Sequence, residues 1–287
     1  MKILENIKLS NFSTIKIGGV AKKVYFPENL EDIVYLIKLS QDTNKKLIPI
    51  GIGSNLIFKD GFLDYIFVST KCLKDLNLRQ SGEYIYINVQ AGVSFKTLVN
   101  IVKKYNLEGF ENLSGIPASI GGAVAMNAGA YGSEIFDIVE EVYWINNKAE
   151  LIVSKKEDIK YSYRYSQFQE EGFVYKVILK LKKSNKDISK IIKNHLIERN
   201  KKQPLNLPTT GSTYKNPEGN FAGYLLEKIG FKGKKIGDIG FSEKHANFLV
   251  NYKDAKFKDL KKLLEIAEKK VKKEFNINLE REVKIIE

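Results

Sequence analysis

The chain has 287 residues, of which 43% are hydrophobic and 28% charged, and its net charge is +13 at pH 7. This composition excludes a disordered chain, the length indicates two or three subdomains, and the lack of any long apolar run excludes a membrane span. A single cysteine, Cys72, excludes an intrachain disulfide and a thiolate zinc site, and with only two histidines we expect no metal site.

The amino-terminal residues contain no apolar stretch followed by a small-residue cleavage site, so we expect no secretory signal and a cytoplasmic protein. The lysines are spread along the chain, often beside acidic residues, as in the sequence EIAEKK. We therefore expect no dedicated nucleic-acid surface, although a basic protein can favour small polyanionic ligands electrostatically.

Hydrophobic spacing predicts a small α/β unit at the start of the chain. A helix is expected over residues 27–40, and strands over residues 46–50, 65–69 and 84–90. Ser94 is then placed to cap a second helix. The apolar residues at helical spacing are Leu30, Ile33, Val34 and Ile37 in the first helix, and Phe95, Leu98, Val99 and Val102 in the second.

The second half of the chain predicts strands first and helices later. Strands are expected over residues 138–145, 151–154 and 173–181, and an amphipathic helix over residues 187–199 presents Ile188, Ile191, Ile192 and Leu196 on one face. The sequence KKQP then ends that helix. A turn-rich stretch to Asn220, a short helix near residues 221–229, a helix over Phe257–Phe275 and a strand over residues 279–286 follow.

Residues 113–132, LSGIPASIGGAVAMNAGAYG, form the most informative stretch of the chain. Glycine, alanine, serine and asparagine dominate it, so we expect a poor core segment whose bare backbone can approach a ligand and aim N–H groups at an anion. A structural turn is the simpler reading of a short glycine cluster. A second small-residue turn, GIGSN at residues 51–55, precedes it, and the pair suggests a large phosphate-bearing cofactor in a cleft.

Four polar clusters are ambiguous when each is taken alone. They are YSYRYS at residues 161–166, GSTYKNP at 211–217, KHANF at 244–248 and EREVK at 280–284. GSTYKNP can be an ordinary surface turn, and YSYRYS and EREVK can be strands whose side chains face outward. The histidine of KHANF can be a hydrogen-bonded surface residue. No Gly-x-Ser-x-Gly motif is present, so nothing supports acyl transfer by a serine.

Taken together and in this order along the chain, these clusters resemble the motifs of the UDP-N-acetylenolpyruvoylglucosamine reductase (MurB) family. The likeness runs from NFSTIKIGG at residue 11 to the terminal EVK, through IGIGSNLIFKDG, SGIPASIGGAVAMNAGAYG, YSYRYSQF, RNKKQP, GSTYKNP, SEKHANFLVN and LEREVK. Without an insertion between Gln169 and Phe173, the chain resembles the shorter, type II class.

The resemblance implies an α+β protein with a two-subdomain FAD-binding module, similar to the PCMH or vanillyl-alcohol-oxidase fold, followed by an α+β substrate-binding domain. Residues 1–70 and 71–197 would be the two FAD-binding subdomains, and residues 198–287 the substrate domain. NADPH would reduce non-covalently bound FAD, which would reduce UDP-N-acetylglucosamine enolpyruvate to UDP-N-acetylmuramate. We expect a monomer.

By position, the resemblance also implies roles for individual residues. Ser212 matches the proton donor, and Arg164 and Glu282 match the pair that polarises the enolpyruvyl carboxylate. The expected substrate contacts are Lys215, Asn216, Arg199, Gln203 and Tyr163. The expected cofactor contacts are Gly51, Gly53, Ser54, Asn55, Leu56, Ser114, Gly115, Ile116, Pro117, Ser119, Gly121, Gly122, Ala123, Asn127 and Gly129.

The roles agree with the chemistry, because hydride addition to the enol ether leaves negative charge that a nearby cation stabilises. Two positions depart from the family. Arg281 stands where a proline is usual, which we expect to loosen the backbone ahead of Glu282, and Lys284 stands where arginine is common.

Three rival functions remain open from the sequence. One is another flavin oxidoreductase on the same scaffold, acting on an alcohol or hydroxy acid, which has no need of GSTYKNP or Glu282. Another is a flavin-binding protein without turnover, against which Arg164, Ser212 and Glu282 argue. The third is a nucleic-acid binder, which would need no flavin loops.

Overall fold

The computed structural model, which describes residues 1–287, is built on three sheets of four to six strands. Contacts between residues divide the chain into two units. The first unit comprises Met1–Glu5, Lys23–Ile52 and Asp64–Glu198, and the second comprises Asn6–Lys22, Gly53–Leu63 and Arg199–Glu287. The division at residues 70 and 197 that the sequence suggests stays a prediction.

The first sheet is mostly parallel and carries helix α1 (Leu30–Thr43). Its strands are β1 (Lys2–Lys8), β2 (Val20–Phe26), β6 (Ile66–Ser69) and β3 (Leu47–Ile50) in that order, with β5 (Phe62–Leu63) beside β2. Buried Ile33 and Leu36 of α1 pack against Ile66 and Val68 of β6. The α/β unit expected here is present, although β1 and β2 were not foreseen.

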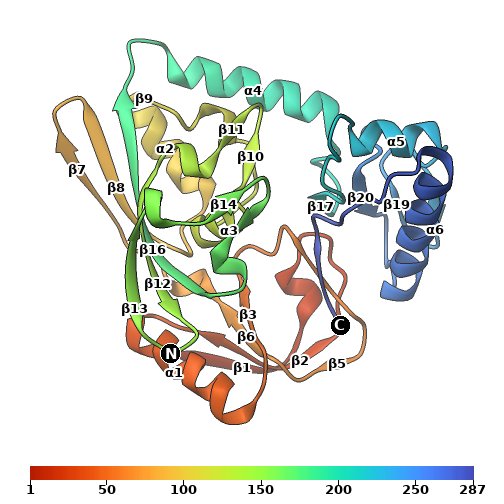
Figure 1. Ribbon diagram of the computed structural model, residues 1–287, viewed down its shortest axis with the longest axis horizontal. Coiled ribbons are helices and arrows are strands. Elements are labelled where there is room, and N and C mark those ends of the chain that lie inside the picture. The colour runs from red at the N-terminus through yellow and green to blue at the C-terminus, as the bar shows by residue number, and fades with distance from the viewer. The chain divides into compact units, whose positions relative to one another are not determined.

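The second sheet is antiparallel and centres on the twelve-residue strand β16 (Gly172–Lys183). The order is β13 (Leu151–Lys155), β12 (Val139–Asn146), β16, β8 (Tyr84–Gln90) and β7 (Leu76–Ser81), with β9 (Leu107–Glu108) also paired to β16. Figure 1 shows β12, β13 and β16 side by side in green. Alternate residues of β8 and β16 are buried, so one face of this sheet meets the main core of the first unit.

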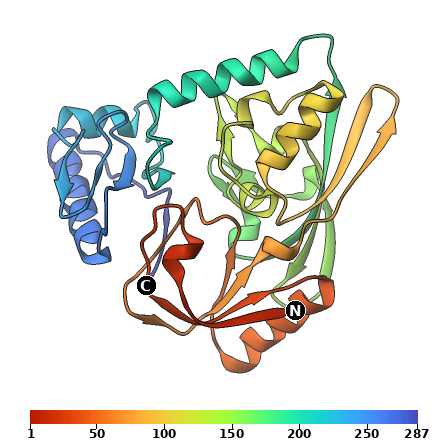
Figure 2. The same ribbon diagram turned by 180° about the vertical axis from the view of Figure 1, so that it is seen from behind.

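Helix α2 (Phe95–Tyr105) covers this core, as the view from behind shows (Figure 2). Ser94 caps it by accepting a hydrogen bond from the Thr97 N–H at 3.2 Å, and Asn106 ends it in the left-handed conformation. Both the cap and the buried face are those expected from the sequence.

The glycine-rich stretch is more than a loop, which corrects the expectation that it makes a poor core segment. It contains the short helix α3 (Ile120–Ala125), and Leu113, Ile120 and Val124 are fully buried in the main core of the first unit. Small residues permit this packing, because a side chain on Gly121 would press against Ala91. Two hairpins lie nearby in the chain, β10 (Gly129–Ala130) with β11 (Ser133–Glu134), and β14 (Tyr161–Ser162) with β15 (Tyr165–Ser166).

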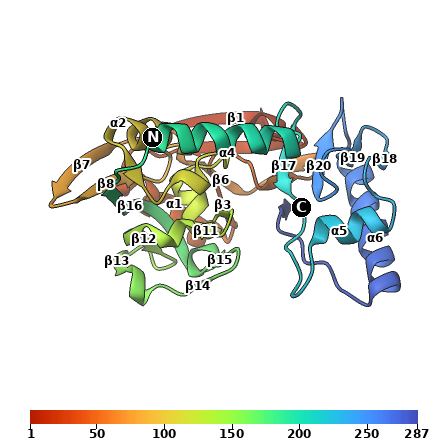
Figure 3. The same cartoon turned by 90° about the horizontal axis from the view of Figure 1, so that it is seen from above.

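The sheet of the second unit is antiparallel. Its strands are β17 (Thr209–Ser212), β20 (Phe248–Asn251), β19 (Ile239–Phe241) and β18 (Lys235–Ile236). Helices α5 (Ala222–Lys228) and α6 (Phe257–Phe275) lie side by side in Figure 3 and share one apolar core with it. The strand β21 (Lys284–Ile286) pairs in parallel with β4 (Leu56–Phe58).

Four boundaries differ from the sequence prediction. Helix α1 begins at Leu30, because Asn29 caps it, and continues to Thr43. Helix α4 (Ile188–Lys202) runs past residue 199 and leaves Leu196 exposed. The turn-rich stretch contains β17, and the terminal strand is limited to β21. Short 3₁₀ helices occupy Leu9–Phe12, Thr70–Cys72, Glu111–Leu113, Ile135–Asp137, Lys156–Asp158 and Gln167–Gln169.

Candidate active site

The two small-residue loops meet within the first unit. Ser119 is buried, and its Oγ makes no hydrogen bond. The same Oγ fills the space that a side chain on Gly51 would need, so any larger residue there would force Ser119 to move. A buried hydroxyl without a partner beside bare backbone suits the oxygen-rich pyrophosphate of a dinucleotide, which is the cofactor chemistry expected from these loops.

The other expected cofactor residues divide between the units. Ser114, Asn127 and Gly129 share the first unit with Gly51, whereas Gly53 to Leu56 belong to the second. Gly53 has φ of +74°, and a side chain there would collide with the Phe12 carbonyl. Asn55 acts inside the second unit, where its Nδ2 donates to the Glu282 carbonyl at 3.0 Å.

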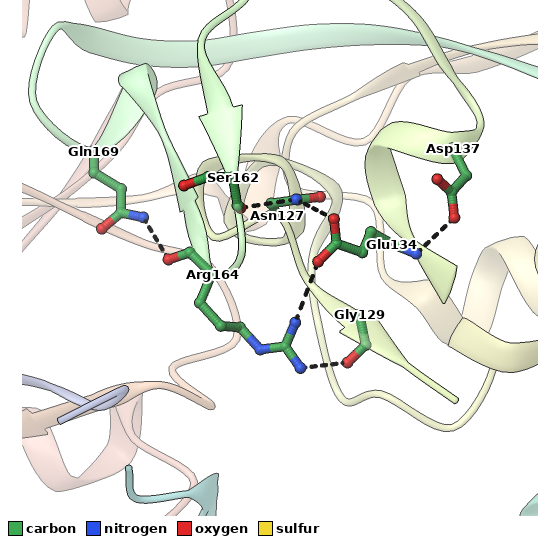
Figure 4. A network of polar contacts seen from close by, with 7 residues as sticks. All are labelled: Asn127, Gly129, Glu134, Asp137, Ser162, Arg164 and Gln169. Carbon is green, nitrogen blue, oxygen red and sulfur yellow. Dashed lines mark hydrogen bonds and ion pairs between the residues drawn. The ribbon is translucent and has the colours of Figure 1, made fainter. Parts of the chain in front are cut away.

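Arg164 lies at the tip of the β14–β15 hairpin, in the left-handed conformation with φ of 57°. Its Nη2 donates to the Gly129 carbonyl at 2.8 Å, and its Nη1 lies 3.9 Å from Glu134 Oε1 (Figure 4). Gln169 Nε2 donates to the Arg164 carbonyl at 3.2 Å. The ring of Tyr163 is 4.7 Å from the guanidinium carbon. The backbone carbonyl and the guanidinium of Arg164 are therefore both held by neighbouring groups.

Glu134 is a site residue that the sequence analysis missed. Its second oxygen accepts from Asn127 Nδ2 at 2.6 Å, and the same Nδ2 donates to the Ser162 carbonyl at 2.9 Å (Figure 4). Asn127 is fully buried. The expected cofactor contact Asn127 thus also ties the glycine-rich stretch to the hairpin of Arg164. No spacing rule relates residues 127, 134 and 164, and only the fold brings them together.

Ser212 ends β17, opposite Phe248 of β20. The segment after it is held by Asn247, a buried residue of the KHANF cluster. The Thr213 N–H donates to the Asn247 carbonyl at 2.7 Å, the Tyr214 N–H donates to Asn247 Oδ1 at 3.0 Å, and Asn247 Nδ2 donates to the Tyr214 carbonyl at 2.8 Å. This clamp gives a structural role to a cluster that was ambiguous in the sequence.

Glu282 lies beside the Ser212 segment. Its N–H donates to the Thr213 carbonyl at 2.8 Å, and the Lys215 N–H donates to the Glu280 carbonyl at 2.9 Å. Lys215 Nζ also pairs with Glu280 Oε1 at 2.6 Å. The second unit thus brings Ser212, Lys215 and Glu282 onto two adjoining segments of backbone.

The expectation of a loose backbone ahead of Glu282 is wrong. The Arg281 guanidinium makes two hydrogen bonds to Glu268 of α6, at 2.6 and 2.9 Å, and its backbone bridges to Tyr214. Side-chain bonding fixes this segment in place of a proline ring.

Three further expected substrate contacts lie near helix termini: Arg199 and Gln203 at the end of α4, and Asn216 at the start of α5. Arg199 is buried in the last turns of α4, and the Gln203 N–H donates to its carbonyl at 2.8 Å. Gln203 Oε1 is buried without a partner. Asn216 Oδ1 accepts from the Ala222 N–H at 3.1 Å and so starts α5. Tyr163 and Arg164 belong to the first unit, and the other substrate residues to the second.

Two observations concern the chain as a whole. No group of three histidine, cysteine, aspartate or glutamate residues is arranged to hold a metal ion. None of the helices combines the length and the apolar character that crossing a bilayer demands.

Comparison with known proteins agrees with this reading. Residues 21–154 match the model of an FAD binding domain, and residues 203–286 match the C-terminal domain of UDP-N-acetylenolpyruvoylglucosamine reductase. The fold and these two matches define an FAD-dependent oxidoreductase, and the expected fold class and flavin cofactor are confirmed.

Full-length relatives identify the family. The chain is 42% identical over 287 residues to UDP-N-acetylenolpyruvoylglucosamine reductase of Aquifex aeolicus, covering 100% of this chain and 96% of the relative. It is 37% identical to that of Fusobacterium nucleatum, with 100% of both covered. The crystal structure of the Thermus caldophilus enzyme (MurB) superimposes with a TM-score of 0.82 at 29% identity, covering 100% of this chain and 98% of the other. The chain belongs to the UDP-N-acetylenolpyruvoylglucosamine reductase family.

Proposed function

We propose that this enzyme reduces UDP-N-acetylglucosamine enolpyruvate to UDP-N-acetylmuramate for peptidoglycan synthesis, with Ser212 as the proton donor and Arg164 and Glu282 as the groups that stabilise the developing charge. The FAD binding domain and the family of full-length relatives support the reaction. The observation that supports the residue roles is the hydrogen bond from the Glu282 N–H to the Thr213 carbonyl. Because Thr213 directly follows Ser212, this bond places the backbone of Glu282 beside that of Ser212.

Gly51, Ser119 and the glycine-rich backbone of the first unit would hold the pyrophosphate of FAD. The unpartnered Ser119 Oγ can donate to a phosphate oxygen, and glycine at position 51 leaves room for this hydroxyl. When bound, FAD accepts a hydride from NADPH and passes it to the enolpyruvyl group.

Arg164 would bind the substrate carboxylate. Hydride addition places negative charge on the carbon next to that carboxylate, and the charge spreads onto its oxygens. A guanidinium already held by the Gly129 carbonyl and Glu134 needs little reorganisation to stabilise this charge. Its planar donors also match a carboxylate in geometry.

Ser212 would deliver the proton that completes the reaction. The carbon beside the carboxylate must be protonated after the hydride arrives, and a positioned hydroxyl can act as the general acid. The clamp of Asn247 on residues 213 and 214 fixes the backbone from which this hydroxyl projects.

The test separates the two half-reactions by stopped-flow absorbance of the flavin. NADPH should reduce the flavin of Ser212→Ala at the parent rate, whereas reoxidation by UDP-N-acetylglucosamine enolpyruvate should slow by about 10²–10⁴-fold. Thr213→Val is the matched control, because it removes the neighbouring hydroxyl, whose Oγ makes no hydrogen bond. Equal slowing of both phases would remove Ser212 from the role of proton donor.

The proposal extends to a monomeric enzyme of the cytoplasm, where NADPH is available. Light scattering of the FAD-loaded protein tests the monomer, and a mass of twice 32.7 kDa would contradict it.

A further inference from the structure

Arg281 directs its side chain away from Glu282 and onto helix α6. Nε donates to Glu268 Oε1 at 2.6 Å and Nη2 donates to Glu268 Oε2 at 2.9 Å, which is a two-point contact of a guanidinium with a carboxylate. Arg281 exposes 30% of its side chain and Glu268 exposes 26%. The hydrogen bond to Glu268 raises the pKa of the Arg281 guanidinium, so the arginine stays charged at every working pH.

The backbone at Arg281 is paired with the segment that follows Ser212. Arg281 and Tyr214 form an isolated antiparallel bridge. Its hydrogen bonds run from the Glu282 N–H to the Thr213 carbonyl and from the Lys215 N–H to the Glu280 carbonyl. The N–H of Arg281 itself takes no part in the bridge.

Both sides of this bridge are anchored on the same part of α6. Tyr214 is fully buried, and its hydroxyl donates to the Leu264 carbonyl at 3.4 Å, one helical turn before Glu268. Burial raises the pKa of the Tyr214 hydroxyl far above its usual range, so it remains a donor. The residues around Glu268 on α6, namely Leu264, Ala267 and Val271, are fully buried in the core of the second unit.

From these contacts we infer that Arg281 is a positioning residue. It fastens its own backbone, which is paired with Tyr214, to Glu268 and so holds Glu282 in register with Ser212. The inference rests on the proposed function of Ser212 and Glu282. Because Glu268 neutralises the Arg281 charge at close range, the role is geometric rather than electrostatic. A proline at this position would restrict the same backbone through its ring, and it would cost the bridge no hydrogen bond.

The test compares two double variants that lose the ion pair equally. Arg281→Pro with Glu268→Gln should reoxidise its reduced flavin with the enolpyruvyl substrate within about threefold of the parent rate. Arg281→Met with Glu268→Gln lacks both the ion pair and the proline ring, and its reoxidation should be slower by about 10–10²-fold, as small misplacements of reacting groups typically cost. The KM for the substrate and the rate of flavin reduction by NADPH should change little in either variant.

Two further variants guard against loss of folding. Arg281→Lys keeps the charge and one contact, and it should slow reoxidation by an intermediate factor. Lys261→Met breaks an exposed ion pair of the same helix, between Lys261 and Glu287, and should match the parent.

Three outcomes would overturn the inference. They are equal reoxidation rates in the two double variants, parent-like reoxidation in Arg281→Lys, and a fall in flavin reduction as large as the fall in reoxidation. Failure of the proposed function is distinguishable, because the parent's reduced flavin would then not be reoxidised by the enolpyruvyl substrate at all.

Discussion

Arg164 combines a strained backbone with a side chain that is bonded at several points. A left-handed conformation in a residue with a side chain costs roughly 1–2 kcal/mol, and the hairpin, Gln169 and Gly129 hold it in place. Strain of this kind is kept where the direction of a side chain matters.

We expect Arg164→Lys to retain its FAD and to lose activity by about 10–10²-fold, the range for one lost hydrogen bond between charged groups. An ammonium cannot hold the Gly129 carbonyl, Glu134 and a substrate carboxylate in one plane. Steady-state NADPH oxidation with the enolpyruvyl substrate measures the loss. Arg79→Lys, at an exposed arginine of the first unit, is the control. Turnover of Arg164→Lys at the rate of this control would rule out the proposed carboxylate contact.

Gly51 is the residue at which cofactor binding is most easily tested. Gly51→Ala places a methyl group against Ser119 Oγ and must displace this proposed phosphate donor, so we expect the dissociation constant for FAD to rise by about 10–10²-fold, the range for one lost hydrogen bond to a charged group. Ser119→Ala alone removes the proposed phosphate donor without introducing a collision, and it should also raise the dissociation constant. Fluorescence titration of the apoprotein with FAD gives both constants. If Gly51→Ala binds FAD as the parent does, the two loops do not form the cofactor site.

At the scale of elements, sequence prediction succeeded where a local signal sets the boundary. Ser94 starts α2, as expected. Asparagines in the left-handed conformation end α1, α2 and α6 at positions 44, 106 and 276, but the sequence analysis did not use this signal and expected α1 to end at residue 40. Helix α6 was expected with both ends correct. Sequence prediction failed for β1 and β2, whose pairing depends on strands later in the chain.

Prediction of the site shows the same limit. Resemblance supplied Arg164, Ser212 and Glu282, but not the groups that hold them. Glu134 and Glu268 are ordinary charged residues in the sequence, and only tertiary packing brings each to an arginine. The burial of the glycine-rich stretch was also missed, because small residues pack well only against a surface that the sequence does not display.

The segment between β19 and β20 links acid sensitivity to the clamp of Asn247. His245 Nδ1 accepts a hydrogen bond from the Asn247 N–H at 3.2 Å, and burial lowers the pKa of His245. Its pKa in the folded protein thus lies below that in the unfolded chain, near 6.5. Stability is therefore complete above pH 6.5 and is lost as the pH falls from there through the folded pKa.

We expect the unfolding temperature to drop by a few degrees (~2–4 °C per kcal/mol) between pH 7.5 and pH 5, and His245→Gln to remove part of that drop. Circular dichroism at the two pH values measures it. His195→Gln, at the only other histidine, serves as the control. A drop of the same size in His245→Gln and in the parent would show that this histidine does not contribute.

At the scale of the whole molecule, FAD should copurify and be released by heat or acid. Neither small-residue loop contains a histidine or cysteine that could form a covalent flavin bond, and the single cysteine, Cys72, lies outside both. Precipitation with acid should leave a yellow supernatant. Colour that stays with the denatured pellet would contradict this expectation.

The way the second unit is assembled has a consequence for synthesis on the ribosome. Its strand β4 emerges early, but its partner β21 lies at the far end of the chain, and the contact of Asn55 with Glu282 joins residues 227 positions apart. Until translation reaches residue 286, the edge of β4 lacks its partner, and unpaired edges are where nascent chains aggregate. A nascent chain thus completes its first unit well before its second. Truncation of the mRNA anywhere within codons 199–286 should therefore yield a chain with an incomplete second unit. We expect chaperones to hold this chain, and we expect it to have no partial enzyme activity.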